Sequence, residues 1–272
     1  MSFRVLWCSM FIWCGVMGCH DDSIPQRADQ SQRYVSLSPA MTAMLVGAHM
    51  GDELIGRSAY CREAIDLPVA GDLEHVNAEM IVRLNPTHIF VQRSAADVDA
   101  RLAAIAVEHG WEIVAHPLRD LQDVHAFIQL LPQVDDRDVV QDQCRRWTRA
   151  IEDARRPTDT PSGIRVMLVS GSASPLAWGG NTYLGEMVSA AGGINVLPDA
   201  AWRSVSYEDI ARFEPTLLLV IGEHGRREDW PSTCGRVVSL SEAGLDMPGP
   251  HLANVRQALD ELLASDATTM SK

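Results

Sequence analysis

One pattern of residues occurs twice in this chain and constrains its fold more than any other feature. The first copy spans Asn77–Val91 and the second spans Ser206–Val220, with Glu, Ile, Arg, Pro, Thr and Val recurring in register. In each copy a helix-capping residue precedes a glutamate in the first turn, and a proline ends the helix before an apolar strand. This order of helix, proline and strand is also common in unrelated α/β proteins. Six matches in register nevertheless favour a duplicated architecture with two similar lobes.

Strands and helices alternate on both sides of a long helical stretch. Apolar segments predict strands at 34–38, 54–56, 88–91 and 111–115, and again at 165–169, 194–197, 217–220 and 236–240. Such alternation requires mostly parallel sheets covered on both faces. We therefore expect an α/β fold of two Rossmann-like lobes, each a mostly parallel sheet flanked by helices, joined by one long connecting helix.

The expected boundaries follow from this alternation. The first lobe spans 34–120, a connecting helical segment spans 121–157, and the second lobe spans 158–272. The second half of the connecting segment is predicted to be one long helix, ended by the turn-forming residues 157–163. The alternative is a surface helix that belongs to the first lobe.

The N-terminal residues resemble a bacterial lipoprotein signal peptide. Arg4 precedes a short apolar run, and Val16-Met17-Gly18-Cys19 resembles a lipobox, so residues 1–19 predict a signal peptide with Cys19 as the lipidated residue. The polar segment 20–33 is suited to a tether. The alternative is a short N-terminal core helix with an incidental cysteine.

The net charge and the cysteines of the chain argue against several classes of function. A formal net charge of −13 argues against sequence-independent binding to nucleic acid and against a broad electrostatic membrane surface. Cys61, Cys144 and Cys234 show no C-x-x-C spacing, so we expect buried thiols rather than a disulfide framework or a zinc knuckle. A Cys61–Cys234 bridge stays open.

Residues that directly follow the strands are the candidates for ligand contact, because open α/β sheets bind ligands beyond the carboxyl ends of their strands. Their aromatic members suit a broad, partly apolar ligand such as a macrocycle or a catecholate chelate. Each aromatic residue has core packing as its alternative, and each histidine a structural or solvated role. The candidates are Ser38, Pro39, 58–60, Gln92, Arg93, Ser94, His116, 170–172, Trp178, Trp202, Arg203, His224 and 247–251.

From about Tyr34 to Leu263 the chain resembles the substrate-binding proteins of ABC importers for vitamin B12, haem and ferric siderophores. The stretches that carry the likeness are 33–42, 54–61, 67–71, 77–91, 190–196 and 205–208. The resemblance implies two α/β lobes joined by a long rigid helix, with the ligand held between them. It also implies that Glu79 and Glu208 dock onto arginines of a permease. The alternative is that both are only favourable helix N-terminal charges, and the two roles are compatible.

The resemblance further implies ligand contacts at Tyr60, Trp178, Trp202 and His251, and the rule on strand ends adds Arg203 to the expected contacts. His251 stands where many relatives carry arginine after Pro-Gly-Pro, which is less suited to an anionic siderophore and leaves a corrinoid or haem. A histidine there could approach the metal centre of such a ligand.

The sequence thus predicts a lipid-anchored, periplasmic or cell-surface receptor that performs no chemistry. Its partners would be a corrinoid or iron chelate (cobalamin, haem or ferric siderophore) and an ABC permease dimer with its ATPase. No intrinsic cofactor, metal or catalytic residue is expected.

Two other functions are kept as alternatives. One is a receptor for a bare metal ion held by His116, His224, His251 and a carboxylate. The other is an anchored enzyme, although Ser170-Gly171-Ser172 is not a nucleophile elbow and the sequence has no P-loop or G-x-G-x-x-G motif.

Overall fold

The computed structural model describes residues 31–172, 174–222, 229–240 and 245–270. The expected signal peptide, Cys19, nearly all of the tether and His224 lie outside these ranges. All elements named below belong to one compact unit, residues 32–272. Among the described residues, no helix is long and apolar enough to cross a membrane.

The first sheet contains five strands within the described residues, in the order β3-β2-β1-β4-β5, and every pairing is parallel. Parallel strands need crossover connections, and helices supply those between β1 and β2, β3 and β4, and β4 and β5, whereas a loop connects β2 to β3. We call this sheet with its helices the first lobe. Its elements are β1 (Tyr34–Ser36), α1 (Pro39–Gly47), η1 (Gly51–Glu53), β2 (Leu54–Ser58), β3 (Val69–Gly71), α2 (Ala78–Leu84), β4 (His88–Val91), η2 (Ala95–Asp97), α3 (Ala100–His109) and β5 (Glu112–Ala115).

The second sheet contains six strands within the described residues, in the order β11-β10-β6-β7-β9, with β8 paired to β6. Strands β6, β8, β10 and β11 are parallel, whereas β7 runs antiparallel to both β6 and β9. This sheet and its helices form the second lobe. Its elements are β6 (Arg165–Ser170), β7 (Leu176–Trp178), α6 (Tyr183–Ala190), β8 (Ile194–Asn195), β9 (Trp202–Ser204), α7 (Tyr207–Phe213), β10 (Leu217–Ile221), β11 (Arg236–Leu240) and α8 (Leu252–Met270).

The two copies of the repeat fold alike. Helices α2 and α7 each contain seven residues, and a side-chain oxygen caps each one: Asn77 accepts from the Met80 amide and Ser206 from the Asp209 amide. Each helix ends in a residue with left-handed backbone, at Asn85 and Glu214, directly before the proline. A buried strand follows in both copies, so the predicted duplication of helix, proline and strand is confirmed.

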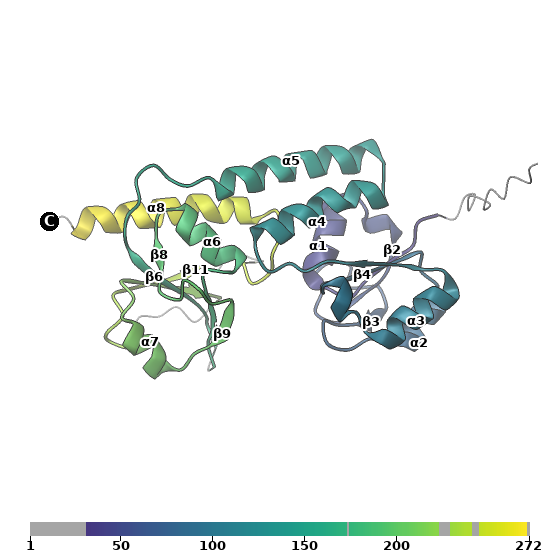
Figure 1. Ribbon diagram of the computed structural model, residues 1–272, viewed down its shortest axis with the longest axis horizontal. Helices are drawn as coiled ribbons and strands as arrows, with labels where there is room; N and C mark the ends of the chain where they lie inside the picture. Colours follow the sequence, from purple (N-terminus) through teal and green to yellow (C-terminus); the bar gives the residue numbers. More distant parts are fainter. Residues whose placement is uncertain (1–30, 173, 223–228, 241–244, 271–272) are drawn as a thin grey trace, which may run out of the picture. The chain divides into compact units, whose positions relative to one another are not determined.

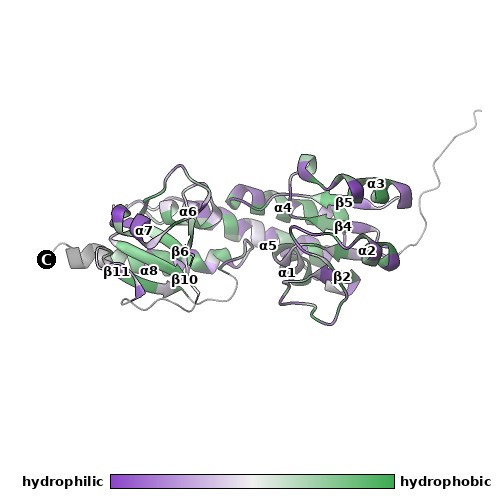
Figure 2. Ribbon diagram, turned by 90° about the horizontal axis from the view of Figure 1, so that it is seen from below, coloured by the Kyte–Doolittle hydropathy of each residue, from purple (hydrophilic) through white to green (hydrophobic). Residues whose placement is uncertain are grey.

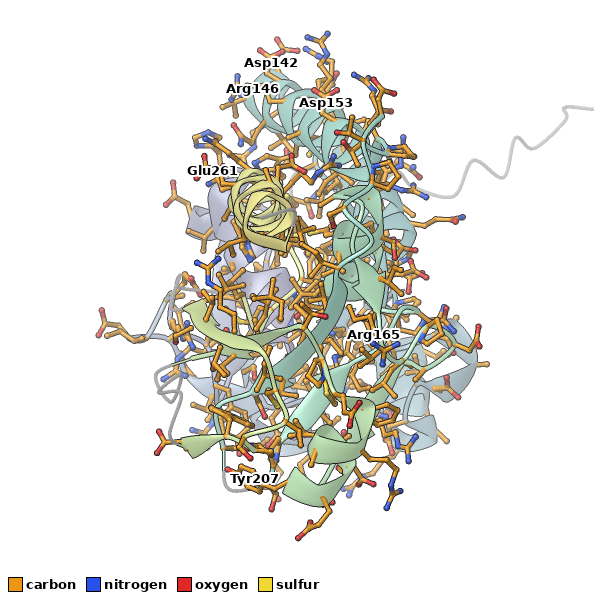
Figure 3. All side chains as sticks on the ribbon, turned by 90° about the vertical axis from the view of Figure 1, so that its left-hand side faces the viewer. Asp142, Arg146, Asp153, Arg165, Tyr207 and Glu261 are labelled. Atoms are coloured by element: carbon orange, nitrogen blue, oxygen red, sulfur yellow. The ribbon has the colours of Figure 1, made fainter. Side chains whose placement is uncertain are left out.

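Two helices, α4 (Leu121–Val134) and α5 (Asp138–Arg155), connect the sheets and lie side by side (Figure 1). The single long helix expected in the second half of this stretch is α5. Its buried residues recur at helical spacing, at Val140, Cys144 and Ile151, while Asp142 and Arg146 project outward from the helix (Figure 3).

A single hydrophobic cluster runs beneath α1, α4, α5, α6 and α8 and includes residues of both sheets. Alternation along β10 explains how a strand serves two faces: Leu217, Leu219 and Ile221 join this cluster, whereas Leu218 and Val220 pack on the opposite face with α7. Helix α8 contributes Leu252, Val255, Leu259 and Leu263 to this cluster, and the strands β6 and β10 of the second sheet are strongly hydrophobic (Figure 2). The two lobes therefore share one core along the helical side.

Three short strands were not predicted. Strands β3, β7 and β9 contain three residues each, too few to show an alternating pattern. Pairing with sequence-distant partners forms them, as where Trp178 pairs with Leu168 on one side and with Trp202 on the other.

Gly185 offers a test of the packing around α6. A Cβ at this position would lie 1.9 Å from the carbonyl oxygen of Gly179. We expect Gly185→Ala to destabilise the fold by about 3 kcal/mol through overpacking, although alanine normally stabilises a helix interior by about 1 kcal/mol relative to glycine. Urea unfolding measures this change. Ser189→Ala on the exposed side of α6 is the control, and a stabilised Gly185→Ala protein would contradict the packing described.

Candidate functional site

The carboxyl ends of the parallel strands lie along one edge of each sheet, and the residues beyond them form the candidate site. In the first lobe these residues follow β1, β2, β4 and β5. Ser38, after β1, caps α1 and donates from its hydroxyl to the side-chain oxygen of Gln92, after β4, at 2.5 Å. The loops of neighbouring strands are therefore tied together at this edge.

A cavity of about 470 Å³ lies where this edge meets Trp202 of the second lobe, and we call it the Trp202 hollow. Its volume falls within the usual range for small-molecule sites. Both lobes contribute to its wall. The lining residues are Gln92, Arg93, Ser94, Asp97, Pro117, Leu118, Arg119 and Trp202.

Trp202 packs against Tyr183 of its own lobe, and Tyr183 in turn contacts the first lobe. The ring of Trp202 lies 6.2 Å from that of Tyr183, measured between centroids. Tyr183 is buried and donates its hydroxyl hydrogen to the carbonyl oxygen of Leu245 at 3.1 Å, while its amide donates to the carbonyl oxygen of Arg119 at 3.0 Å. Burial raises the pKa of the Tyr183 phenol well above its usual value. Trp202 thus packs against a tyrosine side chain that is held in place by hydrogen bonds and stays uncharged at neutral pH.

The two arginines of the Trp202 hollow are already engaged by acceptors of their own lobe. Arg93 donates to the carbonyl oxygen of Leu73 and lies 3.3 Å from the Glu74 carboxylate. Arg119 pairs with Asp123 at 2.9 Å, and this hydrogen bond raises the pKa of the Arg119 guanidinium. Neither guanidinium is left without a counter-charge.

A second cavity, of about 480 Å³, lies at the turn before α8, and we call it the His251 hollow. Arg62 of the first lobe and Asp246 of the second form an ion pair of 3.3 Å near it. Its wall is mainly apolar, with a few polar groups. The lining residues are Ala40, Ala43, Met44, Arg62, Glu63, Trp147, Met247, Pro248, Gly249, Pro250, His251 and Asn254.

The structure places the predicted ligand residues unequally. Trp202 and His251 each line a hollow, and the Tyr60 ring is 72% exposed after β2. Trp178 was expected to be exposed beyond a strand, and this placement is wrong: it lies within β7, is 4% exposed and belongs to the shared core. Arg203 points to the face opposite Trp202, because successive strand residues alternate, and its charge acts on Asp209.

His116 has a structural contact in place of a ligand contact. One of its ring nitrogens lies 2.9 Å from the carbonyl oxygen of Asp123, and the ring stacks on Phe127. In the part of the chain that the structure describes, no three His, Cys, Asp or Glu residues converge as metal ligands. Cys61, Cys144 and Cys234 are buried, as expected, and burial raises the pKa of Cys144 to about 11.

Glu79 and Glu208 occupy the same place in the two copies of the repeat. Each lies in the first turn of its helix, and each is exposed. Tyr207 beside Glu208 lies at the lower end of the view in Figure 3, at the start of α7. The two lobes therefore present one acidic side chain each at equivalent positions.

Sequence reasoning missed several residues of the hollows. Trp147 lies on the connecting helix, where its helical spacing predicts core packing. Glu63, Arg119 and Asn254 lie two or more residues beyond the strand ends or within a helix. No local pattern distinguishes these residues from solvent-facing ones, because the opposite lobe completes the cavity.

A glutamate also links the lobes at the start of α4. The carboxylate of Glu186 in α6 accepts a hydrogen bond of 3.1 Å from the amide of Leu121. Burial raises the pKa of Glu186, and the hydrogen bond from Leu121 opposes this shift in part.

Comparison with known proteins confirms the resemblance found in the sequence. A protein of Yersinia pestis (strain Pestoides F) named vitamin B12-binding protein is 27% identical over 262 residues, covering 90% of this chain and 91% of that protein. No protein-family model matches the chain.

Solved structures share the fold. The periplasmic vitamin B12 binding protein BtuF of Vibrio cholerae superposes with a TM-score of 0.71 at 21% identity, covering 87% of this chain and 98% of that one. The periplasmic haem binding protein HutB of the same organism gives 0.68 at 16% identity, covering 85% and 98%. The predicted α/β fold of two lobes with a connecting helix is confirmed.

The raised pKa of Glu186 gives a test of the contact between α6 and α4. Its folded pKa lies above its unfolded pKa, so the folded state takes up the proton first as the pH falls. Between about pH 7.5 and about pH 5 we expect the wild-type protein to gain stability relative to Glu186→Gln. Urea unfolding at both pH values measures this difference. Glu108→Gln, on the exposed side of α3, controls for the lost charge, and a relative loss of wild-type stability at low pH would contradict the assignment.

Proposed function

We propose that this chain is the substrate-binding component of an ABC importer and captures a corrinoid or an iron chelate (cobalamin, haem or a ferric siderophore). The lobes 34–120 and 158–272 would hold the ligand between them, with 121–157 as the connecting segment. The observation that carries the proposal is the Trp202 hollow, to which both lobes contribute and which lies beyond the carboxyl ends of the strands. A broad, partly apolar ligand suits a cavity with an indole ring in its wall.

The similarity to a vitamin B12-binding protein along nearly the whole chain supports this proposal. In it the protein performs no chemistry and has no intrinsic cofactor. Trp202 and His251 each line one of the two hollows and the Tyr60 side chain is exposed after β2, so we propose these three residues as ligand contacts. Trp178 and Arg203 are not proposed as contacts, because Trp178 is buried and Arg203 faces away from Trp202.

The shared core favours capture in a largely preformed cleft. Separating the lobes would expose part of the cluster under α4, α5 and α8 to water, at a cost of about 25 cal/mol for each Å² of apolar surface. Small adjustments of the loops around the hollows are the expected response to the ligand.

Anchoring and docking complete the proposed role. Acylation at Cys19 after removal of the signal peptide would hold the receptor at the membrane, on the periplasmic or outer face. Glu79 and Glu208 would dock onto an ABC permease dimer that works with its ATPase. Two matched acidic residues, one on each lobe, suit a partner with approximate two-fold symmetry.

A receptor for a bare metal ion is the main competing function. It would need His116, His224 and His251 to converge with a carboxylate, and His116 instead contacts a backbone oxygen. Metal retained after dialysis and lost on substituting His251 would favour this alternative. An anchored enzyme would require turnover of a substrate by the purified protein.

Titration with cyanocobalamin, haemin and ferric siderophores, followed by quenching of tryptophan fluorescence, tests the proposed ligand class. We expect saturable binding of at least one of them and an affinity about 30-fold lower in Trp202→Ala, the effect of removing a buried aromatic contact. Trp202→Phe should retain most of the affinity. No saturable binding by any of these ligands would refute the proposal, and so would an unchanged affinity in a folded Trp202→Ala protein.

Reversal of the two matched glutamates tests the docking role. In Glu79→Lys/Glu208→Lys we expect uptake to be abolished while ligand affinity stays unchanged, because neither residue lines the Trp202 hollow or the His251 hollow. Transport assays in cells and titration of the purified protein measure the two quantities separately. Glu108→Lys is the control for charge reversal elsewhere. A loss of ligand affinity would instead assign the pair to the fold or the cleft.

A further inference from the structure

We propose that Gln92 is a specificity-determining residue of the Trp202 hollow, and that its side-chain amide donates hydrogen bonds to an acceptor oxygen of the ligand. The inference rests on the proposed function, because it places the ligand in that hollow. Cobalamin, haem and ferric siderophores all carry acceptor oxygens, as carboxamides, carboxylates or chelating oxygens. Gln92 anchors the polar edge of a ligand whose flat face packs on Trp202.

A buried serine holds the amide group of Gln92 in one orientation. The hydroxyl of Ser38 donates to Oε1 of Gln92 at 2.5 Å. Ser38 is fully buried, whereas Gln92 is partly exposed and lines the hollow. The oxygen and the nitrogen of a planar amide project from one carbon atom in different directions. Because Oε1 is turned inward to Ser38, Nε2 with its two hydrogens is the polar atom that remains on the side of the hollow.

Ser38 is fixed by further hydrogen bonds. Its Oγ atom caps α1 by accepting from the amide of Met41 at 3.2 Å. Its carbonyl oxygen accepts from the hydroxyls of Ser36 at 3.1 Å and Thr42 at 2.8 Å. A serine hydroxyl has one hydrogen, and that of Ser38 goes to Gln92. The donor side of Gln92 is therefore set by the fold before a ligand arrives.

The charged neighbours of Gln92 also favour an acceptor oxygen at this place. Arg93 and Arg119 line the hollow with guanidinium groups, which donate hydrogen bonds and never accept them. Among the described residues of the wall, Asp97 holds the one carboxylate, and it accepts from the Ser94 hydroxyl. A ligand oxygen beside Gln92 therefore meets several donors, whereas a ligand N–H group meets few acceptors.

Gln92 belongs to the first lobe and Trp202 to the second, so a ligand that contacts both residues bridges the lobes. Gln92, Arg93 and Asp97 also line a neighbouring cavity of about 450 Å³, and the rest of its wall belongs to the first lobe. The ligand is placed in the Trp202 hollow because both lobes contribute to that cavity. A suitable ligand carries a flat apolar face for the indole ring and an acceptor oxygen at its edge.

Titration of the full-length protein with cyanocobalamin, haemin and a ferric catecholate siderophore tests the inference in two variants. Gln92→Leu removes the donors, so we expect the affinity for the ligand that the wild-type protein binds most tightly to fall about fivefold, the effect of one hydrogen bond. Gln92→Glu keeps the size and an acceptor for Ser38 but replaces the donor by an oxygen. Its affinity should fall further, about 20-fold, because two acceptors then face each other.

The order of the two variants separates a ligand contact from a structural role. If Gln92 only held Ser38 in place, Gln92→Glu would keep the wild-type affinity and Gln92→Leu would lose it. Gln133→Glu adds the same charge on the exposed side of α4 and should leave every affinity unchanged. His75→Ala alters the neighbouring cavity and not the Trp202 hollow, so it should also leave the affinity unchanged.

Failure of the inference differs from failure of the proposed function. Wild-type affinity in Gln92→Glu overturns the role of Gln92 and leaves the receptor standing, and so does an equal loss in Gln133→Glu. A loss in His75→Ala as large as that in Gln92→Glu overturns the placement of the ligand in the Trp202 hollow. Binding of none of the three ligands counts against the receptor itself. Thermal unfolding of each variant checks that affinities are measured on folded protein.

Discussion

The structure depends on one hydrophobic cluster that both sheets share. Phe90 of the first sheet and Leu219 of the second belong to it, together with Phe127 of α4 and Ile151 of α5. One face of each sheet packs against α2 and α3 or against α7, and the other faces of both sheets contribute to this cluster together with α1, α4, α5, α6 and α8. This common core sets the positions of the loops that follow the carboxyl ends of the strands, and those loops form the two hollows.

Contacts across the lobes then fix the cleft more finely. Tyr183 and Glu186 of α6 bond to the backbone at Arg119 and Leu121, and Arg62 pairs with Asp246. The shared core sets the approximate positions of the loops at the two hollows. The hydrogen bonds and the ion pair between the lobes then hold these loops in place. The arginines at the two hollows are each balanced by a neighbouring carboxylate: Arg62 by Asp246, Arg93 by Glu74 and Arg119 by Asp123.

Much of the architecture could be predicted because its causes are local. Capping by Asn77 and Ser206, proline after each short helix and apolar strands all act within a few residues, so both copies of the repeat are legible in the chain. Helix α5 is equally clear from the spacing of Val140, Cys144 and Ile151. Strands β7 and β9 were missed because they exist through pairing with distant segments, which leaves no local pattern.

The sequence by itself determined two α/β lobes, the connecting helix and the matched positions of Glu79 and Glu208. It also determined that a ligand site would lie beyond the carboxyl ends of the strands. Only the tertiary structure decided that Trp178 is buried while its strand partner Trp202 lines a cavity. It also decided that Arg203 faces away and that Glu63, from a loop of no evident function, faces a hollow completed by the other lobe. The physical reason is the same in each case: strand register and contacts across lobes set which way a side chain points, and neither is encoded within a short stretch of sequence.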